Sequence, residues 1–211
     1  MNFTLKPFSQ LDPVALARLA ALHQSVMHTL LADLGLPVVL RYYQVCQRDP
    51  AVIGFCAVSP AGEMLGWAVG SPHPDEVNAR LRQPIPWFAG QMLRLAFTRP
   101  GALWQLAVST LSTLTPAPLS SHRGNDWGEG EKPQIELTYI GVAASARGQG
   151  LGRGLLIAFV EASRAAGYSS IALSVETDNP EAIGLYGKSG FKIIRTFREG
   201  RFERHRMELL I

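Results

Sequence analysis

The chain has 211 residues, 47% of them apolar, with a formal net charge of +3 and a pI of ≈ 9.1. This length and apolar share predict a single domain over residues 1–211 with a full hydrophobic core, and the scattered arginines argue against a nucleic-acid partner. The N-terminal residues lack a signal-peptide pattern and no uncharged run has membrane-spanning hydrophobicity, so we expect a cytoplasmic protein without an integral membrane segment.

The first seventy residues predict a strand, two or three helices and a β-hairpin. Asp12 is the expected N-cap of the first helix because Pro13 follows it, and Gly35 closes the helical stretch. The two cysteines, Cys46 and Cys56, fall in a predicted helix and a predicted strand, where buried free thiols are expected. The expected elements are a strand at 2–8, helices at 12–35 and 37–49, and hairpin strands at 51–59 and 63–71.

Residues 72–133 form an unusual segment between the third and fourth expected strands. From Val77 to Asn125 there are five arginines and no acidic residue. Aromatic residues at loosely helical spacing predict two helices interrupted at Arg99-Pro100-Gly101, followed by a Pro- and Ser-rich loop in which His122 is expected at the surface. The helices could pack around the sheet, form a wall or lid of a substrate site, or present an apolar face to a second copy or a membrane surface.

A glycine-rich loop follows the next expected strand, residues 135–144. Its sequence, "SARGQGLGRG", leads into a helix that repeats apolar residues and stops at Gly167. A helix N-terminus offers unpaired backbone N–H groups and the positive end of the helix dipole, which favour phosphate. The loop has neither the Gly-Lys-Ser/Thr ending of a Walker loop nor the spacing of a dinucleotide fingerprint.

Two motifs together resemble those of the GNAT superfamily of N-acetyltransferases. The loop fits the pattern Arg/Gln-x-x-Gly-x-Gly/Ala, with Arg147, Gly150 and Gly152 in place. Downstream of the strand "SIALSV", residues 179–191 ("NPEAIGLYGKSGF") resemble that superfamily's Asn-x-x-Ala-x-x-Leu-Tyr-x-x-x-Gly-Phe segment. The resemblance is close over residues 135–210 and architectural before them.

This resemblance implies an α/β fold with a mixed, mostly antiparallel sheet that splays apart between strands 4 and 5, with helices on both faces. It also implies acetyl-CoA as acyl donor, with its diphosphate on the glycine loop and its pantetheine arm in the split. No spacing of His, Cys or carboxylate residues suggests a metal site, so no metal is expected. The implied cofactor-binding residues are Ile140, Gly141, Val142, Arg147, Gly148, Gln149, Gly150, Leu151, Gly152, Arg153, Asn179, Ala182 and Tyr186. Gly141 is either the β-bulge that opens the split or the space for a neighbouring aromatic ring.

The implied reaction is direct transfer of the acetyl group to a primary amine. Tyr186 is expected to protonate the departing thiolate, and the backbone N–H of Val142 to bind the oxyanion. Glu136 lies eleven residues before Arg147, the offset of the glutamate base in the histone-acetylating branch, so it is the candidate base, with water as the alternative. A small molecule such as an amino sugar is the favoured acceptor, and a homodimer is possible. The alternatives are a protein N-acetyltransferase and a non-catalytic acyl-CoA-binding module.

Overall fold

A computed structural model describes residues 3–98, 133–199 and 202–211 of the chain. Over these residues, seven strands form one sheet in the order β1-β2-β3-β4-β5-β7-β6. The strands are β1 (Thr4–Pro7), β2 (Ile53–Val58), β3 (Met64–Ser71), β4 (Gln134–Val142), β5 (Ser170–Glu176), β6 (Lys192–Glu199) and β7 (Phe202–Leu210). Neighbouring strands run antiparallel except β4 and β5, which are parallel.

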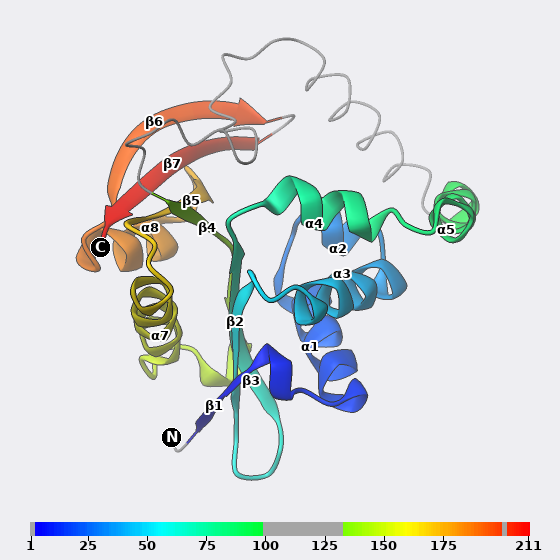
Figure 1. Cartoon of the computed structure of the whole chain (residues 1–211), viewed down its shortest axis with the longest axis horizontal. Coiled ribbons are helices and arrows are strands. Elements are labelled where there is room, and N and C mark those ends of the chain that lie inside the picture. Colours follow the sequence, from blue (N-terminus) through cyan, green and yellow to red (C-terminus); the bar gives the residue numbers. More distant parts are fainter. Residues whose placement is uncertain (1–2, 99–132, 200–201) are drawn as a thin grey trace.

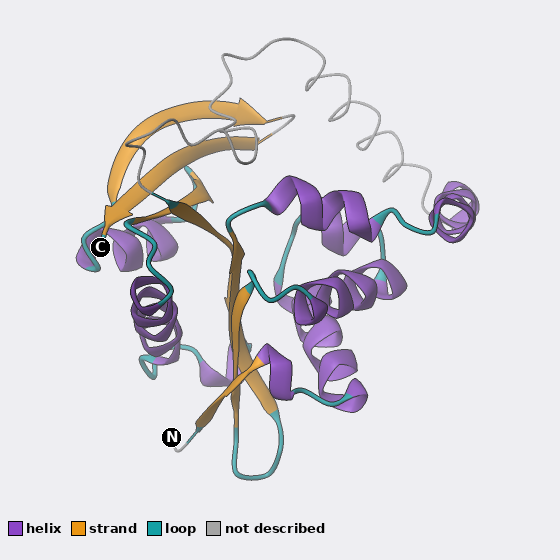
Figure 2. Ribbon diagram, viewed as in Figure 1, coloured by secondary structure: helices purple, strands orange, loops and turns teal. Residues whose placement is uncertain are grey.

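Helices cover both faces of the sheet (Figures 1 and 2). One face carries α1 (Pro13–Val26), α2 (Leu30–Asp33), α3 (Leu36–Arg48) and α4 (Pro74–Leu81), and the other carries α7 (Leu151–Ala165) and α8 (Pro180–Lys188). The other described helical segments are η1 (Phe8–Gln10), α5 (Ile85–Thr98) and η2 (Ala144–Ala146). Two buried clusters follow from this layering, one around Trp67 and Tyr43 beneath α1 and α3, the other around Phe159 and Ile171 beneath α7.

The N-terminal elements form where the local signals predict them. Asp12 caps α1, accepting a hydrogen bond from the backbone N–H of Ala15 at 2.7 Å, and Pro13 occupies the first helical position. Gly35 has a φ of 91°, a left-handed conformation that separates α2 from α3. The cysteines are free and buried, and burial raises the pKa of the Cys46 thiol to about 12.

A β-bulge interrupts β4 at Thr138. The pairing between β3 and β4 shifts where Val69 faces Tyr139 and Gly70 faces Leu137, which leaves Thr138 as the extra residue. In the sequence, Ile135, Leu137 and Tyr139 alternate with polar residues, which predicts that all three face one side of the sheet. This prediction is wrong, because Leu137 packs in the cluster beneath α7 whereas Tyr139 packs against the cluster beneath α1 and α3. The idea that Gly141 forms the bulge is also wrong.

Gly141 instead makes room for an aromatic ring. A Cβ atom at Gly141 would lie 2.4 Å from Cη2 and 2.6 Å from Cζ3 of Trp67, its partner on β3. Trp67 is completely buried, and its ring lies 5.5 Å, centroid to centroid, from the ring of His23. His23 is itself fully buried, hydrogen-bonded through Nδ1 to the Tyr43 hydroxyl at 2.7 Å, and burial lowers its pKa to about 4.

The sequence predicts one helix between residue 77 and the break at Arg99-Pro100-Gly101, but the structure has two helices there, α4 and α5. The chain leaves helical geometry between α4 and α5, where Pro84 lacks a backbone N–H and disfavours helix in the residue before it. α5 ends at Thr98, next to the predicted break at Arg99-Pro100-Gly101. The second predicted helix, the loop after it and His122 lie outside the described residues.

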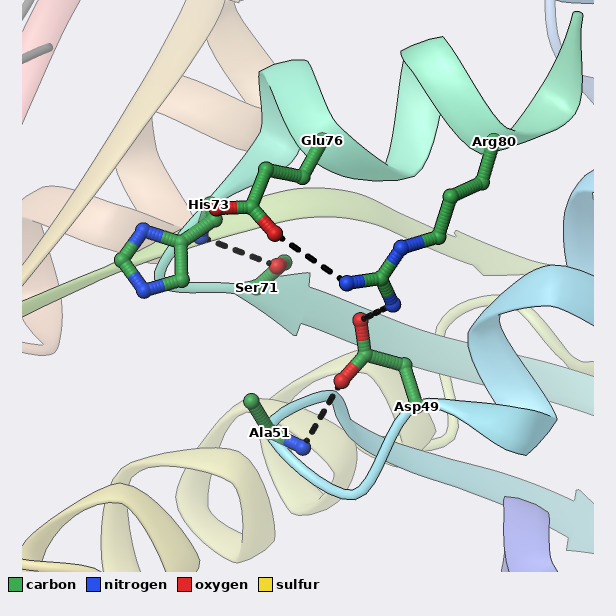
Figure 3. Close-up of polar contacts among 6 residues, drawn as sticks. All are labelled: Asp49, Ala51, Ser71, His73, Glu76 and Arg80. Atoms are coloured by element: carbon green, nitrogen blue, oxygen red, sulfur yellow. Dashed lines mark hydrogen bonds and ion pairs between the residues drawn. The ribbon is translucent and has the colours of Figure 1, made fainter. Parts of the chain in front are cut away.

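One ion pair joins α4 to the turn after α3, and a second lies within α4 (Figure 3). The Arg80 guanidinium lies 2.6 Å from Asp49 Oδ2 and 3.1 Å from Glu76 Oε2, and Asp49 Oδ1 accepts a hydrogen bond from the Ala51 backbone at 3.0 Å. Where the chain leaves β3 toward α4, the Ser71 hydroxyl accepts a hydrogen bond from the backbone N–H of His73. The contact between Arg80 and Asp49 ties the start of the insertion to the turn that leads from α3 into β2.

Candidate acyl-donor site

The sheet opens between β4 and β5, as the resemblance implies. These strands pair only from Gln134–Ser170 to Glu136–Ala172. Beyond that point β4 continues to Val142 and β5 to Glu176 without pairing to each other. The facing backbone groups of the two diverging strands are thus available to a ligand, because backbone N–H and C=O groups away from water require partners.

Successive residues of an antiparallel strand direct their backbone groups alternately to opposite neighbours, which decides which groups of β4 face the opening. The N–H of Ala143 donates to the carbonyl of Leu65 at 2.8 Å, toward β3. It follows that the N–H and C=O groups of Val142 and Ile140 point into the split. The backbone of Gly141 points to β3, so its contribution to the site is the space that it leaves.

A cavity of about 700 Å³ lies at the open end of the split. Its walls come from the end of β4, the glycine loop with the start of α7, the helix α8 and the end of α1. Twelve of the thirteen predicted cofactor-binding residues line it: Ile140, Gly141, Val142, Arg147, Gly148, Gly150, Leu151, Gly152, Arg153, Asn179, Ala182 and Tyr186. The thirteenth, Gln149, does not line it, and its side-chain amide donates to the carbonyl of Ser145 at 3.1 Å.

The glycine loop leaves the N-terminus of α7 bare toward the cavity. Gly150 is the N-cap, with a φ of 76° and no side chain to accept from the first backbone N–H groups. Gly148 has a φ of 70°, and a Cβ at either glycine would meet no atom within 4 Å. Arg147 and Arg153 line the same cavity. The unpaired N–H groups, the helix dipole and two guanidinium groups form a site with the chemistry that a diphosphate requires, and Gly150 itself lines it.

The helix α8 brings Tyr186 to the cavity. Asn179 caps α8, accepting from the backbone N–H of Ala182 at 3.1 Å, and Pro180 occupies its first turn. Tyr186 is 6% exposed and its ring lies 5.7 Å from that of Phe191. Burial raises the pKa of the Tyr186 hydroxyl above its usual value of 10, so the group keeps its proton at neutral pH and is a hydrogen-bond donor.

Glu136 lies at the last paired position before the strands separate. Its carboxylate makes a two-point ion pair with the guanidinium of Arg206 on β7, both distances being 2.9 Å, and Arg206 also donates to the Ser174 hydroxyl on β5 at 3.2 Å. Glu136 does not line the cavity. Its carboxylate is partly exposed on the side of the sheet that carries α1 and α3, and Arg206 holds it in one orientation.

Other residues line the cavity that the motifs do not include. Val26 and Met27, at the end of α1, come from the half of the chain where the resemblance is only architectural. Glu181 and Lys188 on α8 bring one negative and one positive charge to the cavity wall. Both could have been predicted from the sequence, because they lie on the same expected helix as Tyr186, five residues before it and two after it. Among the described residues, no group of three or more His, Cys, Asp or Glu side chains could hold a metal ion, and no helix is long and apolar enough to cross a membrane.

Comparisons with known proteins agree with this geometry. The sequence model described as the acetyltransferase (GNAT) family matches residues 118–191, about a third of the chain. A relative from Parafrankia sp., named mycothiol acetyltransferase, is 34% identical over 126 residues, which are 57% of this chain and 38% of the relative. One from Rhodococcus erythropolis with the same name is 28% identical over 188 residues, 86% of this chain and 56% of the relative. The chain thus spans about half or less of the length of these curated relatives.

Solved structures show the same fold. Arabidopsis thaliana NAA60, solved in complex with acetyl-CoA, aligns over 100% of this chain and 99% of its own with a TM-score of 0.60 at 16% identity. The ribosomal-protein-S18-alanine N-acetyltransferase from Escherichia coli aligns over 100% of this chain and 94% of its own with a TM-score of 0.59 at 17% identity. At these identities the likeness establishes the GNAT fold and no finer property.

Proposed function

We infer that this protein is an N-acetyltransferase. Its described residues have the GNAT fold, and its residues 118–191 match the GNAT acetyltransferase family. It transfers the acetyl group of acetyl-CoA to a primary amine in a ternary complex. The observation that carries the proposal is the cavity at the split, where the bare N-terminus of α7, the unpaired edge of β4 and the Tyr186 hydroxyl meet.

Each wall of the cavity suits one part of the acyl donor. The loop Arg147–Gly152 holds the diphosphate with backbone N–H groups, and the guanidiniums of Arg147 and Arg153 neutralise its charge. The backbone groups of Ile140 and Val142 hydrogen-bond the amides of the pantetheine arm, as a strand added to β4 would. The backbone groups of β4 that have no partner on β5 thereby gain hydrogen bonds to the ligand.

The chemistry proceeds by attack of the amine nitrogen on the thioester carbonyl carbon. Val142 donates its N–H to the oxyanion that forms, since that group points into the split. When the C–S bond breaks, Tyr186 gives its proton to the departing thiolate sulfur, and its raised pKa keeps the proton available until then. The products are the acetamide and CoA.

An amine that arrives as an ammonium ion loses two protons, one before its nitrogen attacks and one after the C–N bond has formed; the second replaces the proton that Tyr186 gives to the sulfur, and the first must be taken by a base. Glu136 is the proposed base, acting through water because its carboxylate does not line the cavity. Arg206 holds this carboxylate in one orientation through the two-point contact. The alternative is that a water molecule takes the proton and passes it to solvent without Glu136, and the pH dependence of the Glu136→Gln variant separates the two.

The acceptor is proposed to be a small molecule. Relatives named mycothiol acetyltransferase support a mycothiol-related amine as the first candidate, and the amino sugar expected from the sequence stays a separate small-molecule candidate. A protein is the second candidate acceptor, in keeping with the name of the Escherichia coli neighbour, a ribosomal-protein-S18-alanine N-acetyltransferase. A non-catalytic acyl-CoA-binding module is disfavoured because Tyr186 is retained and lines the cavity.

Release of free thiol from acetyl-CoA, measured with a panel of amines, tests the proposal. The panel contains amino sugars, a mycothiol-related amine, polyamines and peptides with a free N-terminus. We expect turnover above the rate of hydrolysis with at least one small amine. Binding of acetyl-CoA without turnover on any amine would favour the non-catalytic module, and absence of both would contradict the assignment.

A further inference from the structure

The cavity at the split has walls on both faces of the sheet. Most of its wall comes from the glycine loop, α7 and α8, but Val26 and Met27 at the end of α1 line it as well. In Figure 1, α1 lies across the sheet from α7 and α8, so these two residues meet the cavity from the far side of the split. A donor with its diphosphate at the N-terminus of α7 and its thioester in the split therefore brings its acyl group next to the residues that α1 contributes.

Met27 lies beside the part of β4 that would hold the thioester. Its Cε is 3.1 Å from the position that a Cβ at Gly141 would occupy. Gly141 lies between Ile140 and Val142, whose backbone groups point into the split, and Val142 is the proposed oxyanion donor. A carbonyl oxygen that accepts from this N–H at about 2.9 Å places the adjoining acyl carbons within a few ångströms of β4. The acyl group is thus within reach of the Met27 side chain.

The surroundings of Met27 in the cavity are apolar. The side chains that line the cavity at this point carry no charge and come from α1 and β4: Val26, Met27, Ile140 and Val142. The charged residues of the wall lie on the glycine loop, α7 and α8. An acyl chain is apolar and gains free energy by leaving water for such a surface, so this end of the cavity suits the acyl group and the other end the diphosphate.

The wall behind Gly141 is fixed. The Trp67 ring fills the place of a Cβ at Gly141, and it is fully buried beside the rings of His23 and Tyr43. Met27 is only partly buried, and its backbone N–H donates to the carbonyl of His23 at 2.9 Å, which fixes where its side chain begins. Because a close-packed core does not let Trp67 recede, the room for an acyl chain is set by the length of the Met27 side chain.

We propose that Met27 limits the donor to acyl groups as short as acetyl. This inference rests on the proposed acyl transfer and adds the residue that selects the donor. Each further methylene on the acyl chain extends toward the Sδ and Cε atoms of Met27. An apolar pocket distinguishes substrates that differ by one methylene by roughly 10- to 200-fold, so butyryl-CoA, with two more than acetyl-CoA, is excluded at least as strongly.

The ratio of kcat/KM for acetyl-CoA to that for butyryl-CoA tests this proposal, measured by thiol release with an amine that the wild type acetylates. Both values come from one preparation, so the ratio does not depend on how much of a variant folds. We expect the wild type to favour acetyl-CoA by at least roughly 10-fold. Met27→Ala, which removes Cγ, Sδ and Cε from the wall, should bring the ratio close to one, and Met27→Leu, of similar volume, should keep the preference.

Met64→Ala is the matched control. Met64 on β3 is also partly buried and packs against the same core cluster as Met27, but it does not line the cavity. This variant should keep the wild-type ratio. Calorimetric titration with each donor is a second readout that needs no amine. Butyryl-CoA should bind more weakly than acetyl-CoA to the wild type and to Met64→Ala, and equally well to Met27→Ala.

The proposal is overturned if Met27→Ala keeps the wild-type ratio, if Met64→Ala changes the ratio equally, or if the wild type uses butyryl-CoA as well as acetyl-CoA. A raised KM for the amine in Met27→Ala with an unchanged donor ratio also overturns it, because Met27 then contacts the acceptor. If the wild type binds neither donor, the proposed function fails and this proposal with it. Acetyl-CoA binding or turnover with an unchanged donor ratio contradicts the role of Met27 alone.

Discussion

Substitution of Gly141 by alanine should destabilise the protein by forcing apart β4 and the Trp67 ring. The added Cβ would lie 2.4 Å from Cη2 of Trp67, more than 1 Å inside an ordinary van der Waals contact. The ring cannot move freely, because Trp67 is fully buried and its neighbours include the rings of His23 and Tyr43. Relief of the clash therefore requires movement of the core or of the strand edge at the split.

Overpacking of a core by one methyl group costs typically 1–3 kcal/mol, and the rigidity of this contact places Gly141→Ala near the upper end, about 3 kcal/mol. For a chain of this size, about 3 kcal/mol corresponds to a fall in Tm of roughly 6–12 °C. Urea denaturation followed by Trp fluorescence, with a thermal melt, measures both quantities.

Gly154→Ala is the matched control. Gly154 lies inside α7, and a Cβ there would have its nearest contact at 3.6 Å, from Cζ of Phe3. Removal of a glycine from a helix interior should raise stability by roughly 0.5–1 kcal/mol, the opposite sign. If Gly141→Ala is as stable as the wild type, the proposed packing of Trp67 against β4 is wrong.

Three further predictions concern catalysis and pH. Tyr186→Phe should lower kcat by roughly 100-fold while leaving the Kd for acetyl-CoA unchanged, because only the proton donor is removed; a change confined to Kd would contradict its role as acid. Glu136→Gln should depress the acidic limb of the kcat/KM profile and recover activity as rising pH deprotonates the amine in solution, and an unchanged profile would assign deprotonation to water. The folded-state pKa of His23, about 4, lies below the unfolded value of 6.5, so the unfolded chain binds the proton first and stability falls as pH drops from about 6.5 toward 4, by about 3 kcal/mol. Denaturation of the wild type and of His23→Gln at several pH values checks this, since the variant should lose that part of the slope.

Features set by neighbouring residues along the chain were predictable from sequence. Asp12 with Pro13 indicates the start of α1, and the glycines of the loop before α7 indicate the positive φ angles that Gly148 and Gly150 adopt. The split between β4 and β5 was implied by the two motifs and is confirmed by the short pairing of these strands.

Features set by tertiary contacts were not predictable in this way. The bulge at Thr138 results from the register of β4 against β3, so the local alternation of apolar residues did not reveal it. Met27 lines the cavity from a helix more than a hundred residues away, and Arg206 reaches Glu136 across seventy residues. Neither pairing leaves a periodic signal, because each depends on how the sheet brings distant segments together.

The central claim is that acetyl-CoA binds with its diphosphate at the N-terminus of α7, and calorimetric titration of one variant pair tests it most directly. Gly150→Glu places a carboxylate where the phosphate would lie, and Gly167→Glu makes the same change at the C-terminal end of α7, where the glycine also has a positive φ and open space around it. We expect the wild type and Gly167→Glu to bind acetyl-CoA with the same Kd, and Gly150→Glu to bind roughly 100-fold more weakly or not at all. Equal affinity of Gly150→Glu and the wild type would contradict the claim.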